Sequence, residues 1–190
     1  MTRRLVWLAL ALPSAWMLGR WEFTPDAYGY GHFIGDSGDW AAWLLMATLA
    51  VTPLRLVFDR ARWTGQLLKY RRDMGVASFA YAAAHAVAYL WRKGSLDLIV
   101  EEAGEPYLIA GWAALALFVP LAVTSNDASM RRLRRSWKRL HRLVYPAAVL
   151  TFAHWVWSAF DPTTAWLHIA ALAAIEIVRV ALQTRKRRRV

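Results

Sequence analysis

The chain has 190 residues, of which 58% are hydrophobic and 12 are tryptophan, and its mean hydropathy is +0.25. Soluble domains have a lower apolar fraction of about 45–50%, so this composition indicates an integral membrane protein, and the lack of cysteine excludes disulfides, thiolate metal sites and iron–sulfur clusters. The formal net charge of +11 would fit a nucleic-acid-binding protein, but the placement of the basic residues favours membrane topology as its cause.

Apolar residues fall in blocks of about 15–20, the length at which a helix crosses a hydrocarbon core of about 30 Å. Leu, Ala and Val dominate these blocks, and Trp and Tyr gather near several of their ends, which is typical of membrane helices rather than barrel strands. Six transmembrane helices are predicted, at residues 5–19, 40–58, 75–91, 107–124, 143–160 and 164–182. We expect one all-α integral membrane bundle that occupies residues 1–190 as a single domain.

The first block follows two arginines, so it could be a signal peptide. It lacks a clear small-x-small cleavage site before polar sequence, which favours a retained first helix. With that helix retained, the chain crosses the membrane six times, so its two termini lie on the same side.

The charged residues predict the orientation of the bundle. All of the 24 Lys and Arg residues except Arg20, Arg92 and Lys93 lie on one side of a six-helix arrangement, and most of the 13 acidic residues lie on the other. Lys and Arg are enriched in cytoplasmic loops, where anionic lipid also attracts them. Both termini are therefore predicted to be cytoplasmic, and no nucleic-acid partner is expected.

Two histidines lie inside predicted membrane helices, where an ionisable side chain is costly and usually functional. His85 lies ten residues after Gly75, and His154 lies eleven residues after Leu143, on helices that run in the same direction. At 1.5 Å per residue, both imidazoles lie about 15–16 Å from the cytoplasmic ends of their helices. Two imidazoles at one depth could clamp the iron of a planar tetrapyrrole. The alternative is that each histidine only hydrogen-bonds a neighbouring helix in an alanine-rich seam.

A third histidine, His141, lies thirteen residues before His154. Along one continuous helix it would lie about 20 Å lower and about 140° away from the face of His154. Pro146 could kink this helix or mark its first turn, which would place His141 in the chain before the helix proper. His141 then either contacts a cofactor at the cytoplasmic edge or is a snorkelling or phosphate-contacting residue of a basic loop.

The remaining membrane acid and histidines have simpler interpretations. Glu176 in the sixth segment either takes part in quinone chemistry or proton transfer, or forms an i, i+3 pair with Arg179, which is the simpler reading. His32, in the first periplasmic loop, and His168, near the start of the sixth segment, are expected to be interfacial polar residues.

Several stretches resemble the MsrQ family, the heme-binding membrane subunits of the periplasmic methionine sulfoxide reductase system within the ferric reductase-like transmembrane superfamily. These stretches are "RRDMGVASFAYAAAHAVAYL", "PYLIAGWAALALFVPLAVTS" and "SMRRLRRSWKRLHRLVYPAAVLTFAHWVWS". The resemblance implies heme b in a bacterial inner membrane and electron transfer to a periplasmic molybdopterin methionine sulfoxide reductase. It also implies quinol or a cytosolic flavin reductase as donor, with FMN as a further cofactor, and no catalytic residue on this chain.

The resemblance maps the family's three heme-associated histidines onto His85, His141 and His154. Two-heme members of the superfamily carry four histidines in a square, but here Arg71 and Arg72 stand fourteen and thirteen residues before His85. A second heme would then need His141 and a nonstandard partner. Alternatively, His141, Arg71 and Arg72 hold a flavin phosphate or heme propionates, because arginine binds such anions bidentately.

Two rival functions remain at this stage. One is a stand-alone transmembrane reductase that gives electrons to ferric iron or oxygen without a dedicated partner. The other is a small non-redox transporter or scaffold whose histidines only form hydrogen bonds.

Overall fold

A computed structural model describes residues 2–59 and 61–187 of the chain, with side chains as far as Thr184. Within these ranges every regular element is helical and no strand occurs, which confirms the all-α fold class for this part of the chain. The elements are α1 (Arg3–Phe23), α2 (Tyr30–Val57), α3 (Arg62–Lys93), α4 (Leu96–Glu102), α5 (Pro106–Val123), α6 (Asp127–Leu133), α7 (Arg135–Leu140), the 3-10 turn η1 (His141–Leu143), α8 (Val144–Ser158) and α9 (Thr163–Arg187).

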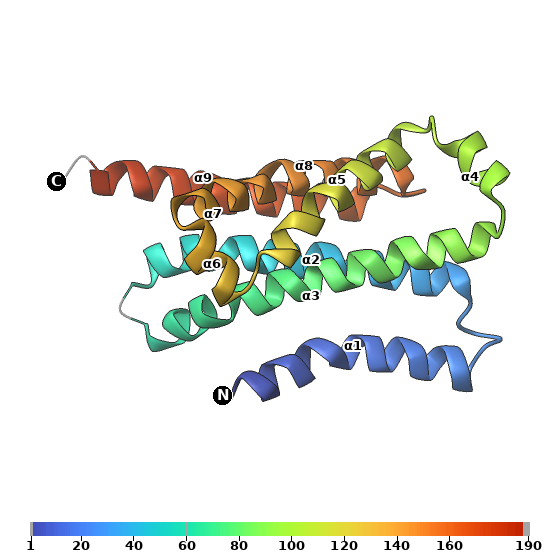
Figure 1. Ribbon diagram of the computed structural model, residues 1–190, viewed down its shortest axis with the longest axis horizontal. Helices are drawn as coiled ribbons and strands as arrows, with labels where there is room; N and C mark the ends of the chain where they lie inside the picture. Colours follow the sequence, from blue (N-terminus) through green and yellow to red (C-terminus); the bar gives the residue numbers. More distant parts are fainter. Residues whose placement is uncertain (1, 60, 188–190) are drawn as a thin grey trace.

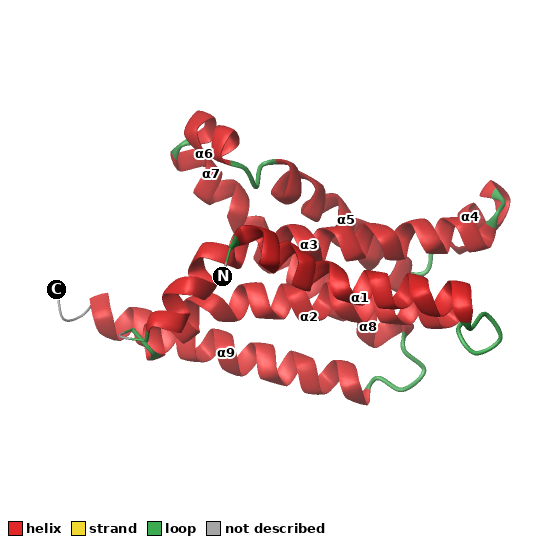
Figure 2. Cartoon of the chain, turned by 90° about the horizontal axis from the view of Figure 1, so that it is seen from below, coloured by secondary structure: helices red, strands yellow, loops and turns green. Residues whose placement is uncertain are grey.

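The long helices form a bundle in which α2 packs along α3, and α5 packs along α8. Helix α9 lies against α2 and α8, whereas α1 lies on the outer side of α2 and α3 (Figure 1). Helix α1 begins and α9 ends toward one end of the bundle, and α4 lies at the opposite end. Figure 2 shows that α6 and α7 project sideways from the end where α1 begins. The connection between α5 and α8 is therefore a folded segment rather than an extended loop.

Small residues on α8 allow its close packing against α5 and α2. Ala147 is fully buried and Ala148 is nearly so, and an alanine lets two helix backbones approach where a larger side chain would separate them. The apolar cluster at this contact consists of Leu45, Leu49, Phe118, Leu121, Ala147 and Ala148. This packing fixes α8, and with it His154, relative to the other helices.

Two helices begin well before their predicted starts. Helix α2 begins at Tyr30 rather than residue 40, and α3 begins at Arg62 rather than residue 75. The predicted bounds follow the apolar residues, which cover only the part of a helix inside the hydrocarbon core. Helix α3 has 32 residues and is about 48 Å long, so its polar part extends beyond a core of about 30 Å. The polar extension of α3 is held by partners, since Asp73 accepts from Arg3 at 2.7 Å.

Short helices also occupy segments that hydropathy left as loops. Helix α4 begins after Ser95, whose side chain accepts from the Asp97 amide, and α6 begins after Asn126, whose side chain accepts from the Ser129 amide. These are ordinary N-cap contacts that a search for apolar blocks does not detect. Arg134 has a φ of 48°, and this left-handed residue separates α6 from α7.

Within the described residues, four helices are long and apolar enough to cross a membrane: α2, α3, α5 and α9 over Thr163–Thr184. Helices α1 and α8 correspond to the other two predicted crossings but are not among these four. Helix α8 has 15 residues, fewer than the about 20 that span a bilayer, and α1 carries charged residues near both of its ends. Arg60 and the run from Arg185 to Arg189, which contributed to the predicted orientation, lie outside the described side chains.

Candidate functional site

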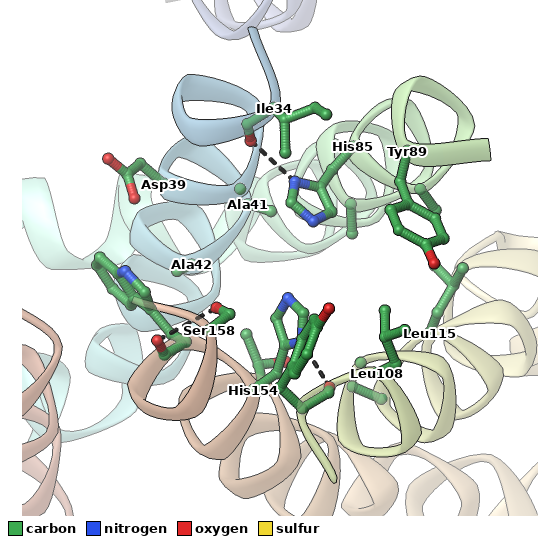
Figure 3. A pocket seen from close by; sticks show the side chains of 18 of the residues that line it. Ile34, Asp39, Ala41, Ala42, His85, Tyr89, Leu108, Leu115, His154 and Ser158 are labelled. Carbon is green, nitrogen blue, oxygen red and sulfur yellow. Dashed lines mark hydrogen bonds between the residues drawn. The ribbon is translucent and has the colours of Figure 1, made fainter. Parts of the chain in front are cut away.

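A cavity of about 450 Å³ lies between α2, α3, α5 and α8. His85 from α3 and His154 from α8 reach into it from opposite sides (Figure 3). Their ring centres lie 5.9 Å apart and their planes are nearly perpendicular, at 86°. The two histidines that the helical rise placed at one depth are therefore brought together across one space.

Both histidines are held by the same kind of hydrogen bond. The Nδ1 atom of His85 lies 2.8 Å from the Ile34 carbonyl oxygen of α2, and Nδ1 of His154 lies 2.7 Å from the Tyr107 carbonyl oxygen of α5. A carbonyl oxygen only accepts, so each Nδ1 carries the proton, and each Nε2 of the neutral ring keeps a free lone pair. The two rings thus offer one metal-binding nitrogen each.

A glycine lies beneath each histidine ring, four residues after the carbonyl that the ring contacts. A Cβ atom at Gly38 would lie 3.1 Å from Nδ1 of His85, and one at Gly111 would lie only 2.8 Å from Nδ1 of His154. The second distance is too short for a real carbon–nitrogen contact, so the ring would have to move. Neither glycine was predicted as part of the site, although Gly111 interrupts a run of large apolar residues.

Small residues line much of the cavity wall and leave its centre open. They come from α2, α3 and α5 and from the residue after α8: Gly31, Gly35, Gly38, Ala41, Ala42, Ala82, Ala86, Gly111, Ala114 and Ala159. A wall of this kind accommodates a flat, bulky ligand between the helices. The space is mostly apolar, as ligand cavities of this size usually are.

Two tyrosines stand at one edge of the cavity. Tyr89 donates to Glu102 of α4 at 3.3 Å, and the Tyr107 ring lies 6.1 Å from that of His154. Lys93 also pairs with Glu102, and the hydrogen bond from this lysine lowers the pKa of the Glu102 carboxyl. Helix α4 therefore connects to the cavity edge through a polar contact.

His141 lies outside this cavity, in the turn η1 before α8. Its Nε2 atom lies 3.0 Å from Oγ1 of Thr124, and the Trp137 ring stacks on it with centres 3.8 Å apart. Burial, and then the positive charge of Arg71, lower the pKa of the His141 imidazole. Pro146 lies in the first turn of α8, so His141 does precede the helix proper, as one reading of the sequence predicted.

The two arginines of the predicted anion site point to different partners. Arg71 donates from Nε to the Thr48 carbonyl oxygen at 3.0 Å. Arg72 donates to the Asp127 carboxylate and contacts the sulfur of Met130. Arg71 stays close enough to His141 to affect its pKa, whereas the charge of Arg72 is balanced by Asp127.

The remaining residues that the sequence singled out have partners too. Glu176 accepts from Arg179 at 2.6 Å, which confirms the i, i+3 pair. His168 lies between the rings of Trp43 and Trp155, with ring centres 6.4 Å and 5.0 Å away. His32 lies in the first turn of α2 rather than in a loop, because α2 begins at Tyr30.

The donor set limits the chemistry of the cavity. Among the described residues, no group of three or more His, Asp or Glu side chains could hold a metal ion. Two imidazoles facing each other instead suit a metal that brings its own equatorial ligands.

Comparison with known proteins places the chain among membrane redox components. The family described as "Ferric reductase like transmembrane component" matches residues 37–152. The protein-methionine-sulfoxide reductase heme-binding subunit MsrQ of Xanthomonas campestris pv. campestris (strain B100) is 45% identical over 126 residues, which cover 64% of this chain and 55% of the relative. The chain thus spans little more than half the length of that relative.

Two further relatives with the same printed name are covered more fully. MsrQ of Xanthomonas euvesicatoria pv. vesicatoria (strain 85-10) is 43% identical over 163 residues, which cover 78% of this chain and 72% of the relative. MsrQ of Rhizobium meliloti (strain 1021) is 38% identical over 162 residues, which cover 77% and 73% respectively. No solved structure matches the chain.

Proposed function

Because this chain belongs to the ferric reductase-like transmembrane family, and within it to the MsrQ heme-binding subunits, we propose that His85 and His154 would hold the iron of a heme in the cavity between α2, α3, α5 and α8. The protein would carry electrons across a membrane. The observation that supports this most strongly is the pair of facing imidazoles, each with Nδ1 tied to a backbone carbonyl and Nε2 free.

The spacing of the rings fits a bis-histidine iron. Two metal–nitrogen bonds of about 2 Å, and about 1.2 Å from each nitrogen to its ring centre, would separate the ring centres by roughly 6–6.5 Å. The observed separation is 5.9 Å. This chain has no cysteine for a thioether bond, so the heme would be held without covalent attachment, as heme b is.

The protein's own contribution is to orient the ligands and exclude water. Each Nδ1–H···O=C bond fixes the tautomer and makes the imidazole a stronger donor to iron. The glycine beneath each ring lets the ring approach the neighbouring helix at hydrogen-bond distance. When bound, the heme supplies one-electron transfer, and the small, apolar wall of the cavity keeps it dry and helps to set its potential.

We propose one heme rather than two. The Thr124 hydroxyl donates to the Pro120 carbonyl at 2.6 Å, so its oxygen accepts from Nε2–H of His141. Trp137 covers one face of the same ring. A flavin phosphate is not assigned to this region either, because Asp127 pairs with Arg72 and the Thr48 carbonyl accepts from Nε of Arg71.

The charges and the fold support one orientation in the membrane. We propose six crossings, with α1 and α8 completing the four longer spans, and both termini on the cytoplasmic side of the inner membrane. In support, α1 begins and α9 ends toward one end of the bundle (Figure 1). The basic segment of α6 and α7 also lies at that end, and the acidic helix α4 lies at the other.

The names of the relatives suggest the electron acceptor. They are subunits of a protein-methionine-sulfoxide reductase, so we propose that this chain reduces a periplasmic molybdopterin methionine sulfoxide reductase. The donor would be quinol in the bilayer or a flavin reductase on the cytoplasmic side. Co-purification with the periplasmic enzyme would separate this function from a stand-alone reductase of ferric iron or oxygen.

A purified sample tests the heme assignment directly. We expect a Soret band that sharpens and shifts to longer wavelength on reduction with dithionite, as for low-spin heme b. Quantification of heme against protein mass should give one heme per chain. A colourless protein, purified from cells supplied with heme precursors, would refute the proposal and leave a transporter or scaffold as the better reading.

A further inference from the structure

A second cavity, of about 470 Å³, lies on the other side of α8, between α8 and α9. We call it the α8–α9 groove. On α8, Phe152, Ala153 and Val156 line this groove, whereas Thr151 and His154 line the histidine cavity. One helix, about 10 Å across, therefore separates the two spaces.

The groove opens at the protein surface, on the side that would face lipid if α8 and α9 both cross the membrane. Three of its lining residues are largely exposed on the protein surface: Val149 at 70%, Trp157 at 58% and Trp166 at 56%. The lining is apolar apart from two residues, Tyr145 and Glu176. A ligand of this groove would thus enter from the bilayer and would meet polar side chains only at Tyr145 and Glu176.

At the polar end of the groove, Glu176 has a carboxylate oxygen without a hydrogen-bond partner. Glu176 accepts from Arg179 at 2.6 Å with Oε2, but its other oxygen, Oε1, and Nε of Arg179 are both buried without a hydrogen-bond partner. Arg179 also donates to the Tyr145 hydroxyl and lies over its ring, 4.6 Å from the ring centre. A buried carboxylate oxygen without a donor costs free energy, so a ligand that brings a hydroxyl group there would be favoured.

We propose that the α8–α9 groove binds a lipid-soluble hydroquinone, whose hydroxyl group donates to Oε1 of Glu176. The proposal rests on the proposed function, because the heme held by His85 and His154 is the electron acceptor. The apolar ring and tail match the groove, and the hydroxyl matches the single free acceptor. A phospholipid fits less well, since its phosphate has no proton to donate to Oε1 of Glu176.

The electrons and protons balance as follows. Oxidation of one hydroquinone to quinone breaks two O–H bonds and releases two electrons and two protons. The electrons would leave singly across α8 toward the heme that His85 and His154 would hold, and the downstream enzyme would take up each electron before the next transfer. Phe152 of the groove and Trp155 of the histidine cavity stack with ring centres 6.0 Å apart and provide a packed path. Glu176 accepts each proton in turn and releases it toward the basic end of α9.

Two substitutions on α9 and one matched control test the site. Glu176→Gln keeps the shape of the side chain but removes the proton acceptor, and Ala173→Phe fills the groove. Ala171→Phe adds the same bulk at an exposed position outside the lining, about 160° around the helix from Ala173. A decyl-chain hydroquinone serves as the electron donor, and a photoreactive azidoquinone, mapped by peptide mass spectrometry, reports binding.

We expect the azidoquinone to label α8 and α9 along the groove, and Ala173→Phe, but not Ala171→Phe, to abolish this labelling. Glu176→Gln should slow hydroquinone-driven heme reduction about a hundred-fold, while its dithionite-reduced spectrum stays unchanged. Labelling spread evenly over the lipid-facing helices, or lost equally in both phenylalanine variants, would overturn the site. An unchanged rate in Glu176→Gln would overturn the role of the carboxylate.

The labelling experiment also separates this proposal from the heme assignment. His154→Ala should lose heme yet retain labelling in the groove, because His154 lies on the other face of α8. If the unmodified protein binds no heme but is still labelled in the groove, the proposed function fails and the binding site stands. If it binds heme but is not labelled there, the site alone fails.

Discussion

The two histidine regions of this protein use the same side chain in opposite ways. His85 and His154 donate from Nδ1 to carbonyl oxygens and turn a free Nε2 into an open cavity. His141 donates from Nε2 to Thr124, and its ring is covered by Trp137. A sequence shows three histidines in membrane or near-membrane segments, but the partner of each ring decides which nitrogen is available to a metal.

The largest expected effect comes from removing the facing ligands. His85→Ala or His154→Ala should abolish heme binding, because one imidazole and an apolar wall cannot hold a bis-histidine heme. His141→Ala should leave heme at the level of the unmodified protein. Heme content per chain, measured by pyridine hemochrome on purified protein, checks all three variants.

Full heme in the His154→Ala protein would contradict the proposed ligand pair. If the His141→Ala protein lost heme while circular dichroism showed unchanged helical content, His141 would also hold a cofactor. Either result would erase the difference between the two regions.

The next effect concerns the glycines beneath the ligand rings. Gly111→Ala would place a carbon 2.8 Å from Nδ1 of His154, so the ring must move, whereas Gly38→Ala leaves 3.1 Å to Nδ1 of His85. Strain of about 1–3 kcal/mol is typical of such overpacking, which would weaken heme binding about ten-fold or more. We expect the larger loss in Gly111→Ala, seen as lower heme affinity in titrations of heme-free protein.

Gly35 offers a control on the same cavity wall. A Cβ atom there meets nothing within 4 Å, although Gly35 lines the cavity and lies on α2 with Gly38. Gly35→Ala should therefore bind heme as the unmodified protein does. Equal losses in Gly35→Ala and Gly111→Ala would mean that the glycines act through general helix packing rather than through the histidine rings.

How far the sequence predicts this site depends on the kind of information required. The shared depth of His85 and His154 follows from a constant helical rise, so counting residues from two helix starts was sufficient, even though α3 begins earlier than predicted. The early start of α3 does not change the predicted depth of His85, because the count begins at Gly75, where the apolar segment starts, and not at the first helical residue.

Other features depend on contacts between helices that no spacing within one segment reveals. Gly38 and Gly111 matter because they face rings on other helices. The engagement of Arg72 by Asp127 depends on α6, a helix whose cap residue lies outside the apolar pattern. The partner of His141 likewise depends on the fold of the segment between α5 and α8.

A smaller effect should follow from weakening the contact that encloses His141. Thr124→Val removes the hydroxyl that accepts from Nε2 and donates to the Pro120 carbonyl. Loss of such a buried hydrogen bond costs about 1–2 kcal/mol, so the melting temperature should fall while heme content stays constant. Loss of heme together with stability in this variant would show that the two regions are coupled rather than separate.

The smallest expected effect is a pH dependence of the melting temperature that arises at His141. Burial and the charge of Arg71 lower the pKa of His141, so the folded protein binds a proton there less readily than the unfolded chain. The resulting stability is present above the ordinary histidine pKa of about 6.5, and it is lost as pH falls through that value toward the lower pKa of the folded state. The melting temperature of the unmodified protein should therefore decrease more between about pH 7.5 and pH 5.5 than that of His141→Asn, which cannot titrate. If the melting temperature fell equally with pH in the two proteins, another group would cause the acid sensitivity. The prediction that His141 is buried as a neutral imidazole would then be wrong.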